Sequence, residues 1–164
     1  MRIIVMSDSH TAFHSVRRIV EQNKDADLFI HLGDGEEEFD DVHALYPDFR
    51  FFSVKGNNDF HSISKKEQLI DVGGVRIFFT HGDRYNVKWS LNELIEAAKE
   101  QGAKIALYGH THVARVDYLD EMYIINPGSV ADSRITKAGY LALDITEAGI
   151  VPVLRTIEHD HRDF

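Results

Sequence analysis

Residues suited to metal binding recur directly after short apolar runs, and this pattern constrains the fold more than any other feature of the chain. Asp8 and His10 follow the run 2–6, and His110 and His112 follow a similar run about a hundred residues later. In an extended segment, residues i and i+2 point to the same side. Each pair is therefore spaced so that two side chains can enter one cavity.

Three further motifs lie between these pairs, namely Gly33-Asp34, Gly56-Asn57-Asn58-Asp59 and Thr80-His81-Gly82. Each of them also comes at the end of an apolar run. Carboxylate, imidazole and amide donors in this mixture suit divalent metals such as manganese, iron or zinc. The candidates are too numerous for one tetrahedral ion and sufficient for two. The chain is therefore predicted to contain a binuclear metal site.

Each candidate by itself also has an ordinary structural explanation. Asp8 could cap a following helix, Asp34 could be a turn aspartate, and Asn57 after a glycine fits simple turn chemistry. The metal site is favoured because all the candidates occupy equivalent positions after predicted strands. His31 lies inside an apolar run, and we interpret it as a hydrogen-bonded core residue or one that orients a ligand.

Apolar spacing predicts alternating strands and helices in the first half of the chain. The runs 2–6, 28–32 and 50–54 indicate buried strands, and 13–20 and 39–46 have helical spacing. This order implies parallel βαβ units with right-handed crossovers. The carboxyl ends of such strands share one edge, where ligands gather in open α/β sheets.

The second half has a different pattern. Gly73-Gly74 predicts a hairpin, and 88–100 is the clearest helix, with Gly102 as its C-cap. A strand at 105–108 precedes segments expected to form antiparallel strands, at 115–119, 122–125, 140–145 and 150–157. A parallel half followed by an antiparallel half predicts two sheets packed face to face, in one domain over residues 1–164.

The ordered set Asp-x-His, Gly-Asp, Gly-Asn-x-Asp, His-Gly and Gly-His-x-His resembles the calcineurin-like metallophosphoesterase superfamily. Its short length and the Gly-His-Thr-His form are most similar to the small phosphodiesterase branch of bacteria and archaea. The resemblance runs from Met1 to about Asp144. It implies an α/β fold, a four-layer α/β/β/α sandwich of two mixed sheets flanked by helices.

The resemblance also implies a set of ligands for two divalent ions. One ion would be bound by Asp8, His10 and His112, the second by Asn57, His81 and His110, with Asp34 bridging both. A carboxylate bridge can hold two dications about 3.5–4 Å apart, and a hydroxide between them becomes a nucleophile at neutral pH. Manganese is the ion we expect first, with nickel, zinc or iron as alternatives.

The chain departs from the family pattern at three places. Asn58 stands where many members carry a histidine that protonates the leaving group, and an amide cannot be a general acid. Gly35-Glu36-Glu37 replaces the Asp-Arg-Gly of the protein-phosphatase and dinucleoside-tetraphosphatase branches, and Asp83 replaces a frequent histidine. These differences argue against a protein phosphatase and favour substrates with good leaving groups, with any general acid unidentified.

Composition narrows the range of partners. The formal net charge is −9, so we expect no nucleic-acid partner. We interpret the acidic segment 36–41 as a solvated first turn of a helix. No apolar run approaches the length of a membrane span, so we expect no membrane partner. The cysteine count is zero, which fits a cytoplasmic location.

The predicted function is that of a cytoplasmic hydrolase, a metal-dependent phosphodiesterase acting on a small phosphoester. One alternative is a phosphomonoesterase with the same metals. A second is a non-catalytic metal-binding scaffold resembling the retromer subunit, and the competent donors at all the ligand positions argue against it. The physiological substrate, the native metal and the formation of homo-oligomers stay open at this stage.

Overall fold

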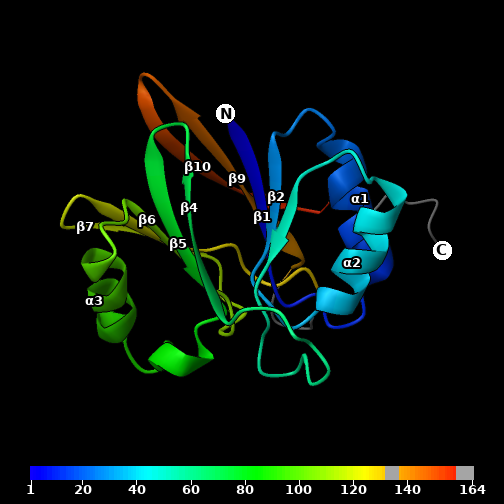
Figure 1. The fold of residues 1–164 in the computed structure, drawn as a ribbon, viewed down its shortest axis with the longest axis horizontal. Coiled ribbons are helices and arrows are strands. Elements are labelled where there is room, and N and C mark those ends of the chain that lie inside the picture. Colours follow the sequence, from blue (N-terminus) through cyan, green and yellow to red (C-terminus); the bar gives the residue numbers. More distant parts are fainter. Residues whose placement is uncertain (132–136, 158–164) are drawn as a thin grey trace.

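The strands of the protein form two five-stranded sheets, seen in a computed structural model that describes residues 1–131 and 137–157 (Figure 1). The first sheet has the strand order β10-β9-β1-β2-β3, with β1 (Arg2–Met6), β2 (Leu28–His31), β3 (Phe51–Ser53), β9 (Gly139–Thr146) and β10 (Gly149–Thr156). The second has the order β4-β5-β6-β8-β7, with β4 (Glu67–Val72), β5 (Val75–Thr80), β6 (Ile105–Leu107), β7 (Arg115–Leu119) and β8 (Met122–Asn126).

Helices cover the outer faces of the two sheets. The first sheet is covered by α1 (Phe13–Gln22) and α2 (Glu36–Leu45), and the second by α3 (Asn92–Glu100) (Figure 1). A short 3-10 turn, η1 (Asp83–Tyr85), lies between β5 and α3. This arrangement confirms the predicted α/β/β/α sandwich of two mixed sheets.

Alternate residues of each central strand enter different layers of the core. In β1, Ile3 and Val5 belong to the cluster between the sheets, whereas Ile4 and Met6 pack with Val16 beneath the helices. A strand covered on both faces reads as a continuous apolar run rather than an alternating one. That is why the first-sheet strands were recognisable in the sequence. Full burial of each such side chain contributes about 1.5–3 kcal/mol to stability.

The predicted division into a parallel and an antiparallel half was wrong. β9 and β10 return to the first sheet, where β9 runs antiparallel to β1 with Ile3 opposite Leu143. In the second sheet, β6 is parallel to both of its neighbours, β5 and β8. The physical reason is that β1 would otherwise leave a row of backbone groups unpaired inside the core. The C-terminal strands therefore complete the sheet begun by the N-terminus.

Two helix boundaries also differ from the prediction. α3 begins at Asn92 rather than at 88, because η1 and a turn through Asn86, which has φ of 53°, occupy the preceding residues. α2 begins at Glu36, at the start of the acidic segment and three residues before the apolar spacing that predicted the helix. The hairpin is confirmed, since Gly73 and Gly74 have φ of 56° and 78°. In the part of the chain that the structure describes, no helix has the length and apolar character needed to span a membrane.

Candidate metal centre

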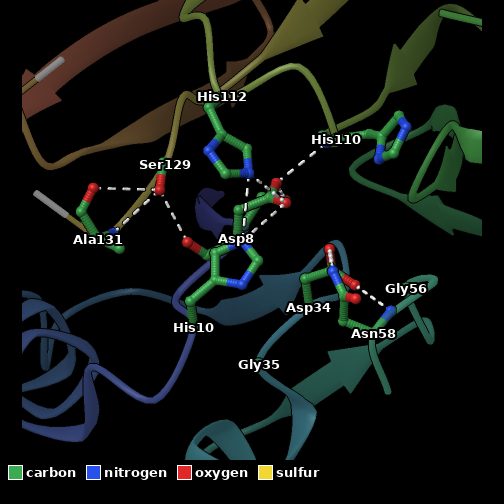
Figure 2. A network of polar contacts seen from close by, with 12 residues as sticks. Asp8, His10, Asp34, Gly35, Gly56, Asn58, His110, His112, Ser129 and Ala131 are labelled. Carbon is green, nitrogen blue, oxygen red and sulfur yellow. Dashed lines mark hydrogen bonds and ion pairs between the residues drawn. The ribbon is translucent and has the colours of Figure 1, made fainter. Parts of the chain in front are cut away.

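The strand ends of both sheets bring six of the predicted ligands to one end of the sandwich. Two groups form there, one of Asp8, His10 and His112 and one of Asp34, His81 and His110. Within each group, one possible ligand atom from every residue lies within 4.8 Å of the others. Figure 2 shows Asp8, His10 and His112 pointing toward one another, although they follow β1 and β6, which belong to different sheets.

The Asp8 carboxylate is the centre of the first group. Its Oδ2 accepts hydrogen bonds from Ser7 Oγ at 2.5 Å and from the His110 N–H at 3.0 Å. Its Oδ1 is buried without a hydrogen-bond partner in the described structure, and lies 3.2 Å from His112 Nε2 and 3.6 Å from His10 Nε2. Leaving a buried carboxylate oxygen unsatisfied is unfavourable by about 1–3 kcal/mol or more.

The second group is organised by His81. Its Nδ1 lies 2.8 Å from the Leu32 carbonyl oxygen, which can only accept, so Nδ1 carries the proton. Nε2 lies 3.4 Å from Asp34 Oδ2 and 3.2 Å from His110 Nδ1, and it offers a lone pair when the ring is neutral. His81 Nε2 also lies 4.0 Å from Asp8 Oδ1, so the two groups adjoin.

The electrostatics keep the carboxylates ionised. Burial acts to raise the pKa of Asp8, but the imidazoles of His10 and His112 outweigh it and hold the pKa far below its ordinary value. Burial likewise opposes ionisation of Asp34, and His81 overrides it, so that the pKa of Asp34 is lowered. Ionised carboxylates are the form that binds metal ions.

The donors of both groups fit divalent metal ions. A buried carboxylate oxygen without a hydrogen bond lies among imidazole nitrogens, and the Nε2 atoms of His10 and His112 are 3.2 Å apart. A cation bound among these lone pairs would satisfy all of them, whereas a single proton between two nitrogens would not. Mixed imidazole and carboxylate donors suit zinc, iron or manganese.

Asn58, rather than Asn57, contacts the carboxylate of Asp34. The Asn58 backbone N–H donates to Oδ1 at 2.8 Å, and its Nδ2 donates to Oδ2 at 2.9 Å (Figure 2). Asn57 is exposed, and its side chain makes no hydrogen bond to any described residue. The bridging of two ions by Asp34 and the ligand role of Asn57 stay predictions.

Asp59 has a structural role that the sequence did not reveal. Its carboxylate accepts the backbone N–H groups of Asp34, Gly35, Glu36 and Gly56, at 2.7–3.3 Å. One side chain therefore joins the loop after β2 to the loop after β3 and stabilises the start of α2. The signal was the final residue of the Gly-Asn-x-Asp motif, which was counted among the metal-binding motifs.

Five of the predicted ligands have a left-handed backbone. Their φ angles are 53° at Asp8, 40° at His10, 58° at Asp34, 70° at His110 and 63° at His112. A non-glycine residue in a sparsely populated region is strained by about 1–3 kcal/mol. The loops are fixed by hydrogen bonds such as Asp8 N–H to Gly33 O and His10 N–H to Asp34 O, both 3.0 Å. The fold therefore holds its ligands in place at a cost to stability.

Glycines beside the ligands act in two different ways. Gly33 and Gly82 have positive φ, at 102° and 106°, but Gly56 and Gly109 do not. At those two positions it is close approach that excludes a side chain. A Cβ on Gly56 would lie 2.2 Å from Asp34 Oδ1, and a Cβ on Gly109 would lie 2.1 Å from Ser7 Oγ.

The structure contradicts two of the structural interpretations made from the sequence, namely capping of a helix by Asp8 and solvation of the acidic segment 36–41. Asp8 does not cap α1, because the N-cap residue is Ala12 and no side chain caps the helix. The first turn of α2 is not fully solvated, because Glu36 and Glu38 are only 8% and 7% exposed. Asp59 accepts the backbone N–H of Glu36 and so joins the beginning of this helix to the loop after β3.

His31 is the buried, hydrogen-bonded residue that the sequence predicted. The Gly33 N–H donates to its Nδ1 at 3.0 Å, so Nδ1 is unprotonated. The neutral ring then carries its proton on Nε2, which lies 2.9 Å from Ser9 Oγ. This side chain therefore links the loop after β1 to the loop after β2.

The chain is similar to known and predicted phosphoesterases in sequence and in structure. The family model described as calcineurin-like phosphoesterase superfamily domain matches residues 1–148. A probable metallophosphoesterase of Bacillus subtilis is 34% identical over 144 residues, which cover 87% of this chain and 83% of that protein. A phosphodiesterase of Methanocaldococcus jannaschii is 25% identical over 186 residues, covering 100% and 98%. The crystal structure of a predicted phosphoesterase from Streptococcus pneumoniae superposes with a TM-score of 0.77 at 26% identity, covering 94% and 97%.

The close packing around Gly109 can be tested with Gly109→Ala. The new Cβ would meet Ser7 Oγ at 2.1 Å and Asp8 Oδ2 at 2.8 Å, so we expect a loss of about 1–3 kcal/mol and weaker manganese binding. Urea denaturation and manganese titration measure the two effects. Glu96→Ala, an exposed residue of α3, is the control. A Gly109→Ala protein as stable as the control, with wild-type manganese affinity, would contradict this packing.

The buried His31 should make stability depend on pH. Burial lowers the pKa of His31 to about 4, whereas an unfolded histidine titrates near 6.5. Between these values only the unfolded state takes up the proton, so this residue removes stability as the pH falls, by up to about 3 kcal/mol. In metal-free protein, the unfolding free energy of His31→Gln should therefore decline less steeply from pH 6.5 to 4 than that of the wild type. Equal slopes would show that His31 titrates normally.

Proposed function

The chain belongs to the calcineurin-like phosphoesterase superfamily, and from this membership we propose that it is a phosphodiesterase that uses two divalent ions. The observation that carries the proposal is Asp8 Oδ1, buried and unpaired beside the imidazoles of His10 and His112. The proposed ligands are Asp8, His10 and His112 for one ion and Asn57, His81 and His110 for the other, with Asp34 between them. We propose manganese as the ion and the cytoplasm as the location.

Such ions, when bound, supply a hydroxide nucleophile at neutral pH and neutralise the phosphoryl oxygens. The chain's own residues prepare the site for them. The Leu32 carbonyl fixes the His81 tautomer so that Nε2 is free to bind, and Asn58 holds both oxygens of Asp34. Ligands already fixed in the metal-free protein lose little freedom when the ions bind.

Charge near the centre favours a diester over a monoester. Glu36, Glu37 and Asp40 line the same cavity as Asn58. A phosphodiester carries one negative charge at neutral pH and a phosphomonoester carries more, so these carboxylates repel a monoester more strongly. The lack of a histidine at position 58 also favours reactions that need no strong general acid. The Methanocaldococcus jannaschii relative, which is named as a phosphodiesterase, supports the same assignment.

A matrix of metals and substrates tests the proposed activity. Metal-stripped protein is reloaded with manganese, nickel, zinc, iron or magnesium, and assayed with bis-p-nitrophenyl phosphate and p-nitrophenyl phosphate. We expect the larger kcat/KM on the diester. A larger value on the monoester would indicate a phosphomonoesterase. Metal binding without hydrolysis of either would indicate a scaffold.

The proposed ligands predict a stoichiometry of two ions per chain. Calorimetric titration of metal-stripped protein with manganese should saturate at two, and His112→Ala should weaken mainly one of the two sites. Asp34→Ala should weaken both, because the carboxylate is proposed to lie between them. His14→Ala, an exposed residue of α1, is the control. Saturation of the wild type at one ion would contradict the binuclear proposal.

Replacing Asn58 with histidine should change the response to the leaving group. In the wild type we expect rates on substituted aryl diesters to fall steeply as the leaving-group pKa rises. In Asn58→His, poor leaving groups should gain most, up to a ceiling of about 10²–10⁴-fold.

We expect a gain below that ceiling because the substitution removes the Nδ2 hydrogen bond to Asp34. Asn58→Ala is the matched control, since it loses the same hydrogen bond without adding an acid. An equal change on all substrates in Asn58→His would show that position 58 does not face the leaving group.

A further inference from the structure

An open cavity of about 660 Å³ adjoins the metal centre, between the first turns of α2 and the loop after β3. Three acidic residues of α2, namely Glu36, Glu37 and Asp40, form one part of its wall. Asn58 also lines the cavity and at the same time donates to Asp34. A group attached to a phosphoryl centre near Asp34 could therefore extend into this space.

Glu36 is the buried member of the three acidic residues of α2 that line the cavity. It is 8% exposed, its Oε1 accepts from Ser64 Oγ, and its Oε2 is buried without a hydrogen-bond partner in the described structure. Burial, and then the charge of Glu36, raises the pKa of Asp40. The α2 side of the cavity therefore has a negative potential.

Few positive groups oppose this potential. His61 is the basic residue of the lining, and it carries charge only when protonated. Lys55 lies at the base of the loop, where its Nζ donates to the Ser62 carbonyl at 3.4 Å rather than to an acidic residue of the cavity. A cationic group entering the cavity would therefore meet carboxylates on the α2 side.

The lining also contains two exposed apolar side chains. Phe60 is 80% exposed and Ile63 is fully exposed, so neither contributes to the core. Aromatic faces attract quaternary ammonium groups, and methyl groups on such a cation also favour apolar contacts. The combination matches an organic cation better than a hydrated inorganic one.

A third metal ion is a poorer explanation of these carboxylates. Within residues 1–131 and 137–157, groups of three or more histidine or acidic ligands close enough to share an ion occur only at the two groups of the metal centre. The acidic residues of the cavity wall are not among them. Dispersed negative charge beside an aromatic side chain is the arrangement that recognises a bulky ammonium group.

We propose that this cavity binds a cationic arm of the substrate, an alcohol that carries a quaternary ammonium group and is esterified to the phosphate. The proposal rests on the proposed function, because the phosphoryl group must lie at the metal centre for its arm to reach the cavity. It deepens that function by naming a substrate class. Arms that end in further phosphates or carboxylates are disfavoured by the same charges.

Two phosphates of the same shape test the charge preference by binding alone. Phosphorylcholine and 3,3-dimethylbutyl phosphate differ only by nitrogen or carbon at the branched centre. Titration calorimetry with manganese-loaded protein should give a Kd for phosphorylcholine about tenfold lower than for the neutral isostere. Equal Kd values would overturn the proposal.

Substitutions of Glu36 and Asp40 test whether the cavity is where the ammonium group binds. In the double variant Glu36→Gln with Asp40→Asn, the ratio of the two Kd values should fall close to one, and the new amide at position 36 can still accept from Ser64. Asp41→Asn, an exposed residue of the same helix outside the cavity lining, should keep the wild-type ratio. A ratio unchanged in the double variant would place the cation elsewhere and overturn the proposal.

Binding of the two phosphates and hydrolysis of a diester test the ammonium-binding proposal and the proposed phosphodiesterase function separately. If a variant is only partly folded, both Kd values rise by the same factor, so their ratio still reports on the cavity of the folded protein. Parallel hydrolysis of bis-p-nitrophenyl phosphate reports on the proposed function. Hydrolysis with a Kd ratio of one would remove the ammonium preference alone, and failure to hydrolyse the diester would remove both proposals.

Discussion

One buried, ionised carboxylate sets the arrangement of this end of the molecule. Asp8 is fully buried, and its Oδ2 is satisfied by Ser7 and by the backbone N–H of His110, which comes from the other sheet. Its backbone carbonyl accepts from Ser129 Oγ at 2.8 Å. A buried charge without compensation is unfavourable by several kcal/mol. The histidines of both strand ends are therefore drawn to the same place, and their positions follow from that of Asp8.

Hydrogen bonds between the loops stabilise the strained backbone of these residues. Five proposed ligands have positive φ, and hydrogen bonds from neighbouring loops hold them there, with Asp59 joining the loops after β2 and β3. Stability given up at such positions is typical of functional sites. The same Asp59 carboxylate accepts the backbone N–H of Glu36 in the first turn of α2, and the Glu36 side chain is buried. Asp59 therefore connects the loop that carries Asp34 to the start of the helix that lines the acidic cavity.

Structural features that depend on residues close together in the sequence could be predicted from the sequence. Apolar runs marked β1 and β2, and the glycine pair marked the hairpin. The positions of Asp8, His10, His110 and His112 directly after apolar runs placed these side chains at one end of the molecule. The extended backbone assumed for the i, i+2 spacing was wrong, because all four residues have left-handed φ angles. Features set by tertiary contacts were not recognisable. The return of β9 to β1, the backbone clamp formed by Asp59 and the burial of Glu36 each depend on partners far away in the sequence.

The central claim is that two adjoining groups of ligands from two sheets each hold a divalent ion. Anomalous diffraction from crystals of the manganese-loaded protein, recorded on both sides of the manganese edge, locates such ions directly. Two peaks are expected in each chain, one among Asp8, His10 and His112 and the other among Asp34, His81 and His110. A single peak, or peaks outside these residues, would contradict the account.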